Sequence, residues 1–348
     1  MDGTLIGNGF NDIGLSWPRC SLLLFEGLNK SDKIKIEKID LAIKKAIKSS
    51  YIGFGTLNRY LYFIQNKNAI RNKNVHILYP GVIPPFFLNL ARKKIVTIHD
   101  LYYLEPNFNI NRTKNFITNR VATKYLKKRL SRDHNPKNYD YVITSGETTK
   151  EKIIKHFGVS GDNIGIVPYI IPEKFFVTGT YTNKSKKRII GYINGQGFNK
   201  TPKLKLFIEH FKKFKNNDIE FHIYGKGFPF QNLIKDTNIK YFGFLPENKL
   251  VDTLSKFDAY LSTSTIEGFG LPIIQAKACK VPVLCYDGDI PQLVKRNTLL
   301  WKDDNLLEII KNRSWEKVDV EKAYLDAEEC RADKVVPKII EVYKKVFE

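Results

Sequence analysis

The stretch "DAYLSTSTIEGFGLPIIQAKACKVPVLCYD", residues 258–287, decides the fold. It opens with an apolar run, passes through a loop with two glycines, continues as a helical pattern that begins near Pro272, and closes with a second apolar run at 281–287. Two short strands joined by one helix form a parallel crossover unit. The stretch therefore predicts a parallel sheet with helices packed on its faces.

The same alternation of short β-rich runs and helical patterns extends in both directions along the chain. Prolines open the predicted helices of the second half, and proline is tolerated in a first turn because its missing N–H has no partner there. These helices begin near Pro202, Pro246, Pro272 and Pro291. The predicted strands are 20–26, 75–80, 94–100, 140–146, 164–169, 188–194, 219–225, 239–245, 258–264 and 281–287. The pattern does not fix the register of the first 55 residues.

A polar, lysine-rich connector at 170–188 separates the two strand-rich halves. We expect a first domain at 1–172, a second at 173–330, and a final helix at 331–348 that packs back on the first domain. Ligands of doubly wound sheets bind beyond the carboxyl ends of the strands. Two such domains facing each other across a cleft would bring those ends together.

Length and charge narrow the class of protein. A chain of 348 residues with 43% apolar content is long enough to bury two globular cores. Its first 30 residues do not have the pattern of a signal sequence, and no apolar run is long enough to cross a bilayer. We therefore expect a cytoplasmic protein. The net charge is +21: 27 Lys and Arg face 13 Asp and Glu in residues 1–165, against 30 and 23 in the remainder. A positive surface attracts phosphates on nucleic acid, anionic lipid or small molecules. Coding bias is an equal explanation for much of the excess.

The four cysteines, Cys20, Cys279, Cys285 and Cys330, form no CxxC pair and no metal-like spacing with the six histidines. We interpret them as reduced packing residues. The sequence predicts no metal site.

The loop after strand 258–264 carries the first chemical signal. Gly268 and Gly270 precede a helix start, where free N–H groups and the positive helix end bind anions and hydroxyls. Glycine lets a ligand approach the backbone closely, and Glu267 beside them can accept hydrogen bonds from sugar hydroxyls. On this pattern alone, a solvent-exposed turn is an equal interpretation.

The order of features resembles the retaining GT-B glycosyltransferases of family 4 over roughly residues 50–310. Members carry a run like "S-x-x-E-G-F-G-L-P-x-x-E-A-x-A-x-x-x-P-V", which is matched here from Ser264 to Val283. The segments "IVTIHDLYYLEP", "DYVITSGETTKEKIIKHFGV" and "FHIYGKG" resemble further family motifs. The resemblance implies an α/β GT-B fold of two Rossmann-like, doubly wound domains facing across a cleft.

The resemblance also implies an activity. It is transfer of a hexose, with retention, from a UDP- or GDP-linked sugar to a glycan, lipid or protein acceptor, without a metal or a separate cofactor. The nucleotide would bind mainly to the second domain and the acceptor to the first. Nucleic acid is not expected as a partner.

Site residues follow from the same resemblance. Glu267 would hold the donor sugar, His99 would reach that sugar from the first domain, and Lys200, with Lys203 as the alternative, would meet the diphosphate. The remaining predicted nucleotide contacts are Gly268, Phe269, Gly270, Leu271, Gln275, Gly225 and, in a glycine-rich first-domain loop, Gly53 and Gly55.

Two departures keep other classes of protein open. Gln275 and Gln292 stand where family members often carry glutamate, so a GT-B-like binding protein without transfer is one alternative. A protein that binds polyanions or membrane surfaces is the other. It is favoured by helix 115–132, where Arg120, Lys124, Lys127, Lys128, Arg129 and Arg132 crowd one side and Phe116, Ile117, Val121, Tyr125, Leu126 and Leu130 fall near the other. Such a helix is typical of peripheral contact with an anionic membrane, here its inner face, and equally of a helix packed on the core with a solvated basic face.

Overall fold

The computed structural model describes residues 2–7, 16–40, 64, 67–80, 83–105, 116–176, 187–194, 202–213, 218–235 and 237–348. These residues form two compact units. The first unit comprises residues 1–169 and 332–348, and the second comprises 170–331. The predicted limits were 172 and 330.

The first unit is built on a six-stranded sheet in the order β2-β1-β3-β4-β5-β6. Each neighbouring pair of strands is parallel. The strands are β1 (Asp2–Gly7), β2 (Lys35–Asp40), β3 (Asn74–Ile77), β4 (Lys93–Ile98), β5 (Tyr141–Thr144) and β6 (Ile164–Ile166). Four of them coincide with predicted strands.

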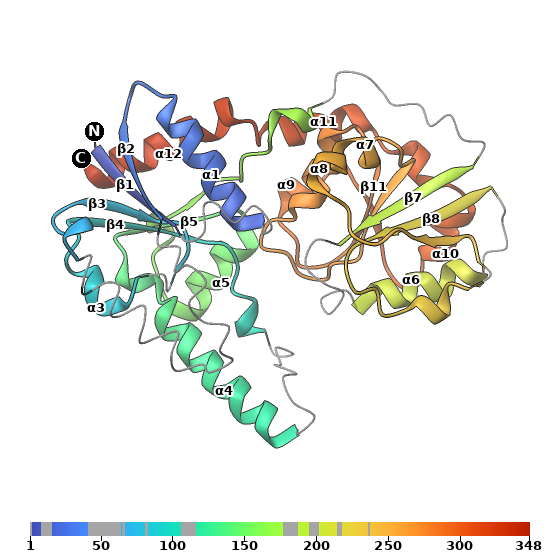
Figure 1. The fold of residues 1–348 in the computed structure, drawn as a ribbon, viewed down its shortest axis with the longest axis horizontal. Helices are drawn as coiled ribbons and strands as arrows, with labels where there is room; N and C mark the ends of the chain where they lie inside the picture. Colours follow the sequence, from blue (N-terminus) through green and yellow to red (C-terminus); the bar gives the residue numbers. More distant parts are fainter. Residues whose placement is uncertain are drawn as a thin grey trace. The chain divides into compact units, whose positions relative to one another are not determined.

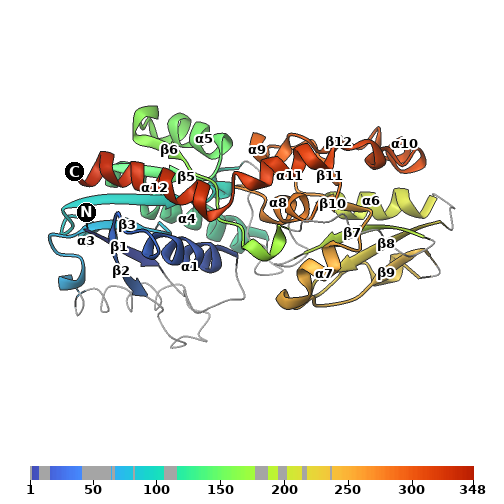
Figure 2. The same ribbon diagram turned by 90° about the horizontal axis from the view of Figure 1, so that it is seen from above.

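Helices cover both faces of this sheet. They are α1 (Ser16–Asn29), α3 (Pro85–Leu88), α4 (Phe116–Asp133), α5 (Glu147–Phe157) and α12 (Ala332–Phe347). In Figure 1, α1 and α12 lie on one face, and α3, α4 and α5 lie on the other. Figure 2 shows α1 and α12 side by side. The unit is therefore doubly wound, as predicted.

The prediction of a strand at 20–26 is wrong, because these residues lie inside α1. The run "CSLLLFE" is rich in leucine, a strong helix former, and has no β-branched residue. A short apolar run of this kind does not separate a buried strand from a helix by its periodicity. The first strand along the sequence is β1, whose residues from Gly3 to Gly7 are buried.

The C-terminal helix α12 belongs to the first unit. The Nδ1 atom of His76 on β3 lies 2.6 Å from the Tyr343 hydroxyl, and its Nε2 atom lies 2.8 Å from Thr97 Oγ1 on β4. Burial and the neighbouring His99 lower the pKa of His76 to about 3. A neutral imidazole thus fastens the last helix of the chain to the central strands.

The second unit repeats the architecture with the strand order β12-β11-β10-β7-β8-β9, again with all pairs parallel. The strands are β7 (Arg188–Ile193), β8 (Ile219–Tyr224), β9 (Ile239–Tyr241), β10 (Ala259–Ser262), β11 (Val283–Tyr286) and β12 (Leu299–Trp301). The first five confirm predicted strands. The short edge strand β12 was not predicted.

The helices of the second unit are α6 (Pro202–Lys213), α7 (Leu250–Leu254), α8 (Leu271–Ala278), α9 (Gln292–Lys295), α10 (Leu306–Lys311) and α11 (Val320–Glu328). Helix α6 begins at the predicted Pro202, α9 directly after Pro291 and α8 one residue before Pro272. The short 3-10 turn Glu247–Lys249 after Pro246 leads into α7. No helix start was predicted for α10 and α11. On one face, α6 and α10 bury Phe207, Ile208 and Ile310 against the strands. On the other, α8 packs against α11 (Figure 1). The fold class is thus confirmed for both units.

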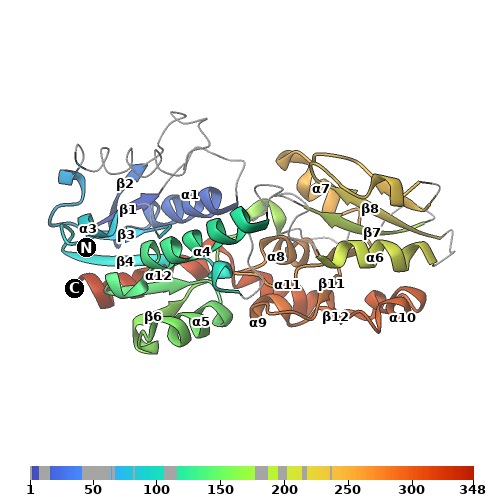
Figure 3. The same ribbon diagram turned by 90° about the horizontal axis from the view of Figure 1, so that it is seen from below.

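Helix α4 differs in part from its predicted pattern. Leu126 and Leu130 pack against the core of the first unit, but Tyr125, predicted for the same face, is 57% exposed. Arg120, Lys124, Lys128 and Arg132 are exposed, and the Arg132 guanidinium lies 3.0 Å from Asp133 Oδ1. The N-terminal end of the helix lies farther from the sheet than its C-terminal end (Figure 1, Figure 3). The packed stripe is therefore narrower than the sequence pattern indicated.

Candidate functional site

The strand order of the second unit fixes where a ligand binds. From β7 the chain proceeds outward to β8 and β9, whereas from β10 it proceeds the other way to β11 and β12. The sheet therefore reverses its winding between the neighbours β7 and β10. Ligands of open α/β sheets bind at such a reversal, beyond the carboxyl ends of the strands. The loop 263–270, which carries Glu267, follows β10 at this point.

Gly270 makes the turn from this loop into α8. Its φ is +96°, in the left-handed region that favours glycine, and a Cβ atom there would lie 2.9 Å from Val294 Cγ1. Its carbonyl accepts the N–H groups of Ile273 (3.0 Å) and Ile274 (3.3 Å), which start the helix. A side chain at this position would displace the helix start.

The helix start leaves two backbone donors unused within the described part of the chain. These are the N–H groups of Gly270 and Leu271, while Pro272 has none. The first N–H groups of a helix have no intrahelical acceptor, and the helix end is positive. Two predicted contact residues thus present donors suited to an anion.

Glu267 lies in a loop with fixed backbone. Its N–H donates to the Asp289 carbonyl (3.1 Å), and the Asp289 N–H donates to the Thr265 carbonyl (2.9 Å). Burial raises the pKa of Tyr260 on β10, and Tyr192 and the Glu267 carboxylate raise it further. The Tyr260 hydroxyl lies 3.5 Å from the Ile193 carbonyl at the end of β7. The Glu267 carboxylate therefore lies close enough to influence Tyr260, whose hydroxyl lies where β7 and β10 are neighbours.

Gln275 lies on α8, one helical turn beyond the helix start. Its side chain is 5% exposed and forms no hydrogen bond with any described residue. Its amide atoms are not among the fully buried polar atoms that lack a partner, so solvent or a ligand can reach them. The amide can therefore offer a donor and an acceptor to a group outside the protein.

The other predicted residues of this loop differ in exposure. Phe269 is buried, so its ring serves the core. Gly268 is half-buried. A ligand would thus meet the backbone rather than the ring at 269.

Lys203 at the start of α6 has partners within the protein. Its ammonium lies 2.5 Å from Asp303 Oδ2 and 5.0 Å from the centre of the Tyr286 ring. The hydrogen bond to Asp303 raises the pKa of Lys203. A diphosphate would have to compete with Asp303 for this charge. Lys200, Gly53 and Gly55 lie outside the described residues, so their assignments stay predictions.

Gly225, after β8, has both backbone polar groups in use. Its N–H donates to the Gly243 carbonyl (2.7 Å), and its carbonyl accepts the Tyr241 hydroxyl (2.6 Å). Gly227, two residues on, has a φ of +71°, and no atom of the described residues lies within 4 Å of the position that a Cβ atom would take there. The open approach at this strand end is therefore at Gly227.

His99 belongs to the first unit, at the end of β4. Its Nε2 lies 2.7 Å from the Leu78 carbonyl, which only accepts, so Nε2 carries the proton. Nδ1 then accepts a hydrogen bond from the Tyr169 hydroxyl. Burial lowers the pKa of His99, against the opposing effects of the Leu78 carbonyl and Asp100. Both ring nitrogens thus have protein partners.

Two further observations concern cysteines and metals. Cys20, Cys279, Cys285 and Cys330 are free and buried, as predicted. Within the described ranges, no three His, Cys, Asp or Glu side chains gather in a way that would hold a metal ion.

Some residues that shape this site were missed in the sequence. Lys295 binds both the Asp287 carboxylate and the Gly288 carbonyl (3.2 Å). A Cβ atom on Gly288 would lie 2.3 Å from the Thr265 carbonyl oxygen. The glycine between two aspartates in "DGD", 287–289, was the one local signal of such a close approach.

Comparison with known proteins bears on the second unit most directly. Residues 179–301 match the family model described as "Glycosyl transferases group 1". This range contains β7, the Glu267 loop, α8 and β11. The match therefore covers the predicted site residues of the second unit, but not His99, Gly53 or Gly55.

Two curated relatives share part of their sequence with the chain. The GPI3 subunit of a Saccharomyces cerevisiae phosphatidylinositol N-acetylglucosaminyltransferase is 27% identical over 180 residues, 48% of this chain and 40% of the relative. An Escherichia coli O-antigen chain mannosyltransferase B is 25% identical over 114 residues, 30% of each chain. The matched region thus spans less than half of either relative.

Similarity to solved structures extends over the whole chain. A sucrose-phosphate synthase from Thermosynechococcus elongatus superposes with a TM-score of 0.73 at 14% identity, covering 99% of this chain and 98% of the other. At this identity the likeness shows the fold alone. The fold is GT-B, with two Rossmann-like units.

Proposed function

We propose that the chain is a glycosyltransferase that moves a hexose from a UDP- or GDP-linked sugar to a glycan, lipid or protein acceptor, with retention and without a metal. The observation that carries the proposal is the start of α8. There a fixed Glu267 loop, two unused backbone donors and the Gln275 amide, which makes no hydrogen bond with a described residue, lie within one short segment.

Each of these groups suits one part of a nucleotide sugar. Departure of a nucleoside diphosphate leaves negative charge on a phosphate, and preorganised N–H donors stabilise such charge. The amides of Gly270 and Leu271 are donors of this kind. Glu267 accepts hydrogen bonds from the sugar hydroxyls, and Gln275 accepts one from the ribose. His99 remains a proposed contact of the sugar, and both of its ring nitrogens already have partners in the first unit.

The relatives guide the choice of donor. One is named as an N-acetylglucosaminyltransferase and the other as a mannosyltransferase. A first panel therefore contains UDP-N-acetylglucosamine, UDP-glucose and GDP-mannose. Release of UDP or GDP without an acceptor is measured first, because many transferases hydrolyse their donor slowly. We expect release from one of the three.

The same panel separates transfer from binding alone. Nucleotide binding by calorimetry with no release from any donor, with or without acceptor glycans, would favour a GT-B-like binding protein. Neither binding nor release would overturn the proposal. The anomeric configuration of the product, read by NMR, tests retention, and addition of EDTA tests independence from metal.

We also propose that α4 rests on the inner face of an anionic membrane. The exposed basic residues Arg120, Lys124 and Lys128 support it, and each charge near such a surface contributes about 1 kcal/mol. Lys127 contributes less, since its ammonium donates to the Glu105 carbonyl (2.9 Å). None of the helices in the described part of the chain combines the length and apolar character needed to cross a membrane.

Sedimentation with vesicles tests the membrane proposal. Vesicles containing phosphatidylserine should pull down the wild-type chain at moderate salt, and neutral vesicles should not. Replacing both Lys124 and Lys128 by glutamine should lower the partition coefficient onto the phosphatidylserine vesicles roughly thirtyfold, at about 1 kcal/mol for each charge. The matched control replaces Lys311 and Lys317, exposed lysines of the second unit. Equal recovery with both kinds of vesicle would rule the docking out.

A further inference from the structure

The backbone of loop 286–290, after β11, turns tightly. The Gly288 N–H donates to the Tyr286 carbonyl (2.8 Å), and the Ile290 N–H donates to the Gly288 carbonyl (3.0 Å). Both hydrogen bonds span two residues, so the loop consists of consecutive three-residue turns. The Gly288 carbonyl also accepts the Lys295 ammonium (3.2 Å). Lys295 thus holds two residues of this loop, Asp287 and Gly288.

This loop sets the position of the Glu267 loop. The hydrogen bonds between Asp289, Thr265 and Glu267 form a short parallel bridge, and Gly288 touches the Thr265 carbonyl with no room for a side chain. A shift of residues 286–290 would therefore move the backbone of Glu267 with it. The two loops behave as one unit whose outer anchor is Lys295.

Lys295 is itself held in place. It lies on α9, a single turn of helix that is too short to be stable alone. Lys277 of α8 is completely buried and donates to the carbonyls of Leu293 (3.1 Å) and Arg296 (2.6 Å) at the end of that turn. It also pairs with Asp326 of α11 (3.1 Å).

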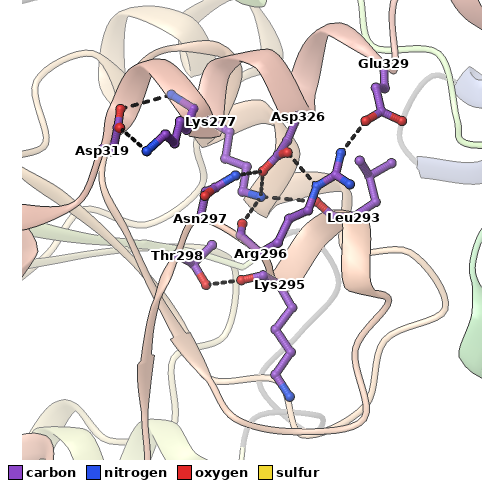
Figure 4. Close-up of polar contacts among 10 residues, drawn as sticks. Lys277, Leu293, Lys295, Arg296, Asn297, Thr298, Asp319, Asp326 and Glu329 are labelled. Carbon is purple, nitrogen blue, oxygen red and sulfur yellow. Dashed lines mark hydrogen bonds and ion pairs between the residues drawn. The ribbon is translucent and has the colours of Figure 1, made fainter.

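Figure 4 shows the Lys277 ammonium within this network, and the Lys295 side chain pointing away from it. Asp326 binds Arg296 (2.5 Å) and Asn297 (3.0 Å) as well. The helix α8 that begins at Gly270 thus anchors α9, α9 carries Lys295, and Lys295 anchors the loop beside Glu267. The Glu267 loop leads back into α8, so this series of contacts begins and ends at the same helix.

We propose that Lys295 is a positioning residue that holds Glu267 in place by closing the loop 286–290. This inference rests on the proposed function for its catalytic consequence, but its structural part does not. The ammonium does not need to touch the substrate. Removing it leaves the Gly288 carbonyl with the Ile290 N–H and Asp287 with the exposed Lys302, and so weakens the hold on both loops, which then move together.

Hydrogen exchange tests the structural part without any assay of activity. Exchange is followed by mass spectrometry in peptides covering 263–270 and 286–291, for Lys295→Met, Lys295→Arg and the wild type. We expect about tenfold faster exchange in both peptides for Lys295→Met and near-wild-type exchange for Lys295→Arg, because loss of one charge-assisted hydrogen bond changes a local opening equilibrium by about that factor. Lys295→Gln replaces Lys295→Met if the latter does not fold.

Lys302→Met is the matched control. Lys302 also binds Asp287 (3.1 Å), but it is exposed and makes no contact with Gly288 among the interactions of the described residues. Its exchange should stay within about twofold of the wild type, since exposed ion pairs contribute little. Unchanged exchange in Lys295→Met, or equal acceleration in Lys302→Met, would overturn the inference.

Donor turnover tests the catalytic part. In Lys295→Met, kcat should fall about tenfold while the donor KM changes less than about threefold, because small displacements of a catalytic group reduce the rate steeply. Lys295→Arg should restore kcat. Faster exchange with unaltered kcat would overturn the positioning role. No turnover by the wild type would overturn the proposed function, and the exchange result would still decide whether Lys295 holds the loop.

Discussion

His99 of the first unit and Gln275 of the second were both predicted to meet the donor, and the protein treats them differently. His99 follows a central strand and gives both ring nitrogens to the Leu78 carbonyl and the Tyr169 hydroxyl. Gln275 is more deeply buried, but its amide has no hydrogen-bond partner among the described residues. One side chain is saturated by the protein, and the other is not.

The difference shows how a structural polar residue is distinguished from a binding residue. Buried side-chain atoms without a hydrogen-bond partner occur elsewhere in the second unit, for example at Thr263 and Trp315, so burial without a partner does not by itself mark a binding residue. Gln275, Gly270 and Leu271 are distinguished by their common place at the start of α8, where the Gln275 amide and the N–H groups of the other two make no hydrogen bond with a described residue. Both ring nitrogens of His99 are engaged within the first unit.

The largest effect is expected for Glu267→Ala. Losing one important active-site contact raises the barrier by about 2 to 4 kcal/mol, which is roughly a 30- to 1,000-fold loss of turnover. The melting temperature should stay close to that of the wild type, because the loop is held by backbone hydrogen bonds. Steady-state release of UDP or GDP measures the loss. Glu308→Ala, an exposed change on α10, is the control, and wild-type turnover in a folded Glu267→Ala chain would remove Glu267 from the site.

We expect the two units to lose stability at different pH values when the protein is acidified. The folded-state pKa of His76 is about 3, below the ordinary value of 6.5, so its contribution to stability is present above pH 6.5 and is lost as the pH falls toward 3. Between pH 7 and pH 4.5 the loss is about 2 to 3 kcal/mol. Glu220 of the second unit behaves otherwise. Burial alone would raise its pKa, but hydrogen bonds from Lys240 and His222 lower it to about 2, so its contribution persists to lower pH.

Hydrogen exchange at pH 7 and pH 4.5, corrected for the intrinsic rates, measures this difference. Peptides of β3 and β4 should lose protection at higher pH than peptides of β10 and β11, which contain no histidine; β8 is left out because burial also lowers the pKa of its own His222. His76→Gln, which cannot titrate, should remove most of the pH dependence of the first unit. Equal loss of protection in both units would contradict the assignment to His76.

Alanine at His99 and at Gln275 compares the two residues directly. His99→Ala leaves the Leu78 carbonyl without its donor and Tyr169 without its acceptor, so we expect a loss of about 2 kcal/mol in the free energy of unfolding. Gln275→Ala leaves no described protein group without a partner and should cost less than half as much. Urea denaturation measures both. Equal losses would break the distinction drawn above.

The smallest effect is expected for Gln275→Glu. A glutamate adds charge and a second acceptor oxygen, and hydrogen bonds to charged groups exceed neutral ones by about 1 kcal/mol. Calorimetry should therefore show roughly fivefold tighter binding of UDP or GDP, with the sugar preference unchanged. Gln275→Ala should weaken binding. If neither variant changes the affinity, Gln275 has no contact with the nucleotide.

The sequence was most informative where chemistry is local. The strands β7 to β11 were readable from apolar runs bounded by glycine and proline, and the loop from Glu267 to Leu271 from its glycines. The opening of the first unit was not readable. The strand at 20–26 was predicted wrongly because leucine-rich runs suit helices and strands alike, and β12 was missed because three residues carry too little pattern.

Long-range contacts explain what else was missed. Lys295 meets Gly288 and Lys277 meets Asp326 only after the sheet has formed, and in a chain with 57 Lys and Arg nothing singles these two out. Lys203 stood out as a candidate for the diphosphate, but its pairing with Asp303 depends on residues 100 positions apart. Spacing along the chain carries no information about such partners.

The return of α12 to the first unit also orders the events of biosynthesis. Residues 170–331 form an uninterrupted unit, and all of them emerge from the ribosome before Tyr343 does. Until Tyr343 emerges, His76 lacks its hydrogen bond to the Tyr343 hydroxyl, although all residues of the second unit are already available to fold. The unit begun first is thus finished last, and a chaperone that holds nascent β-strands would have the longest time to act on β3 and β4.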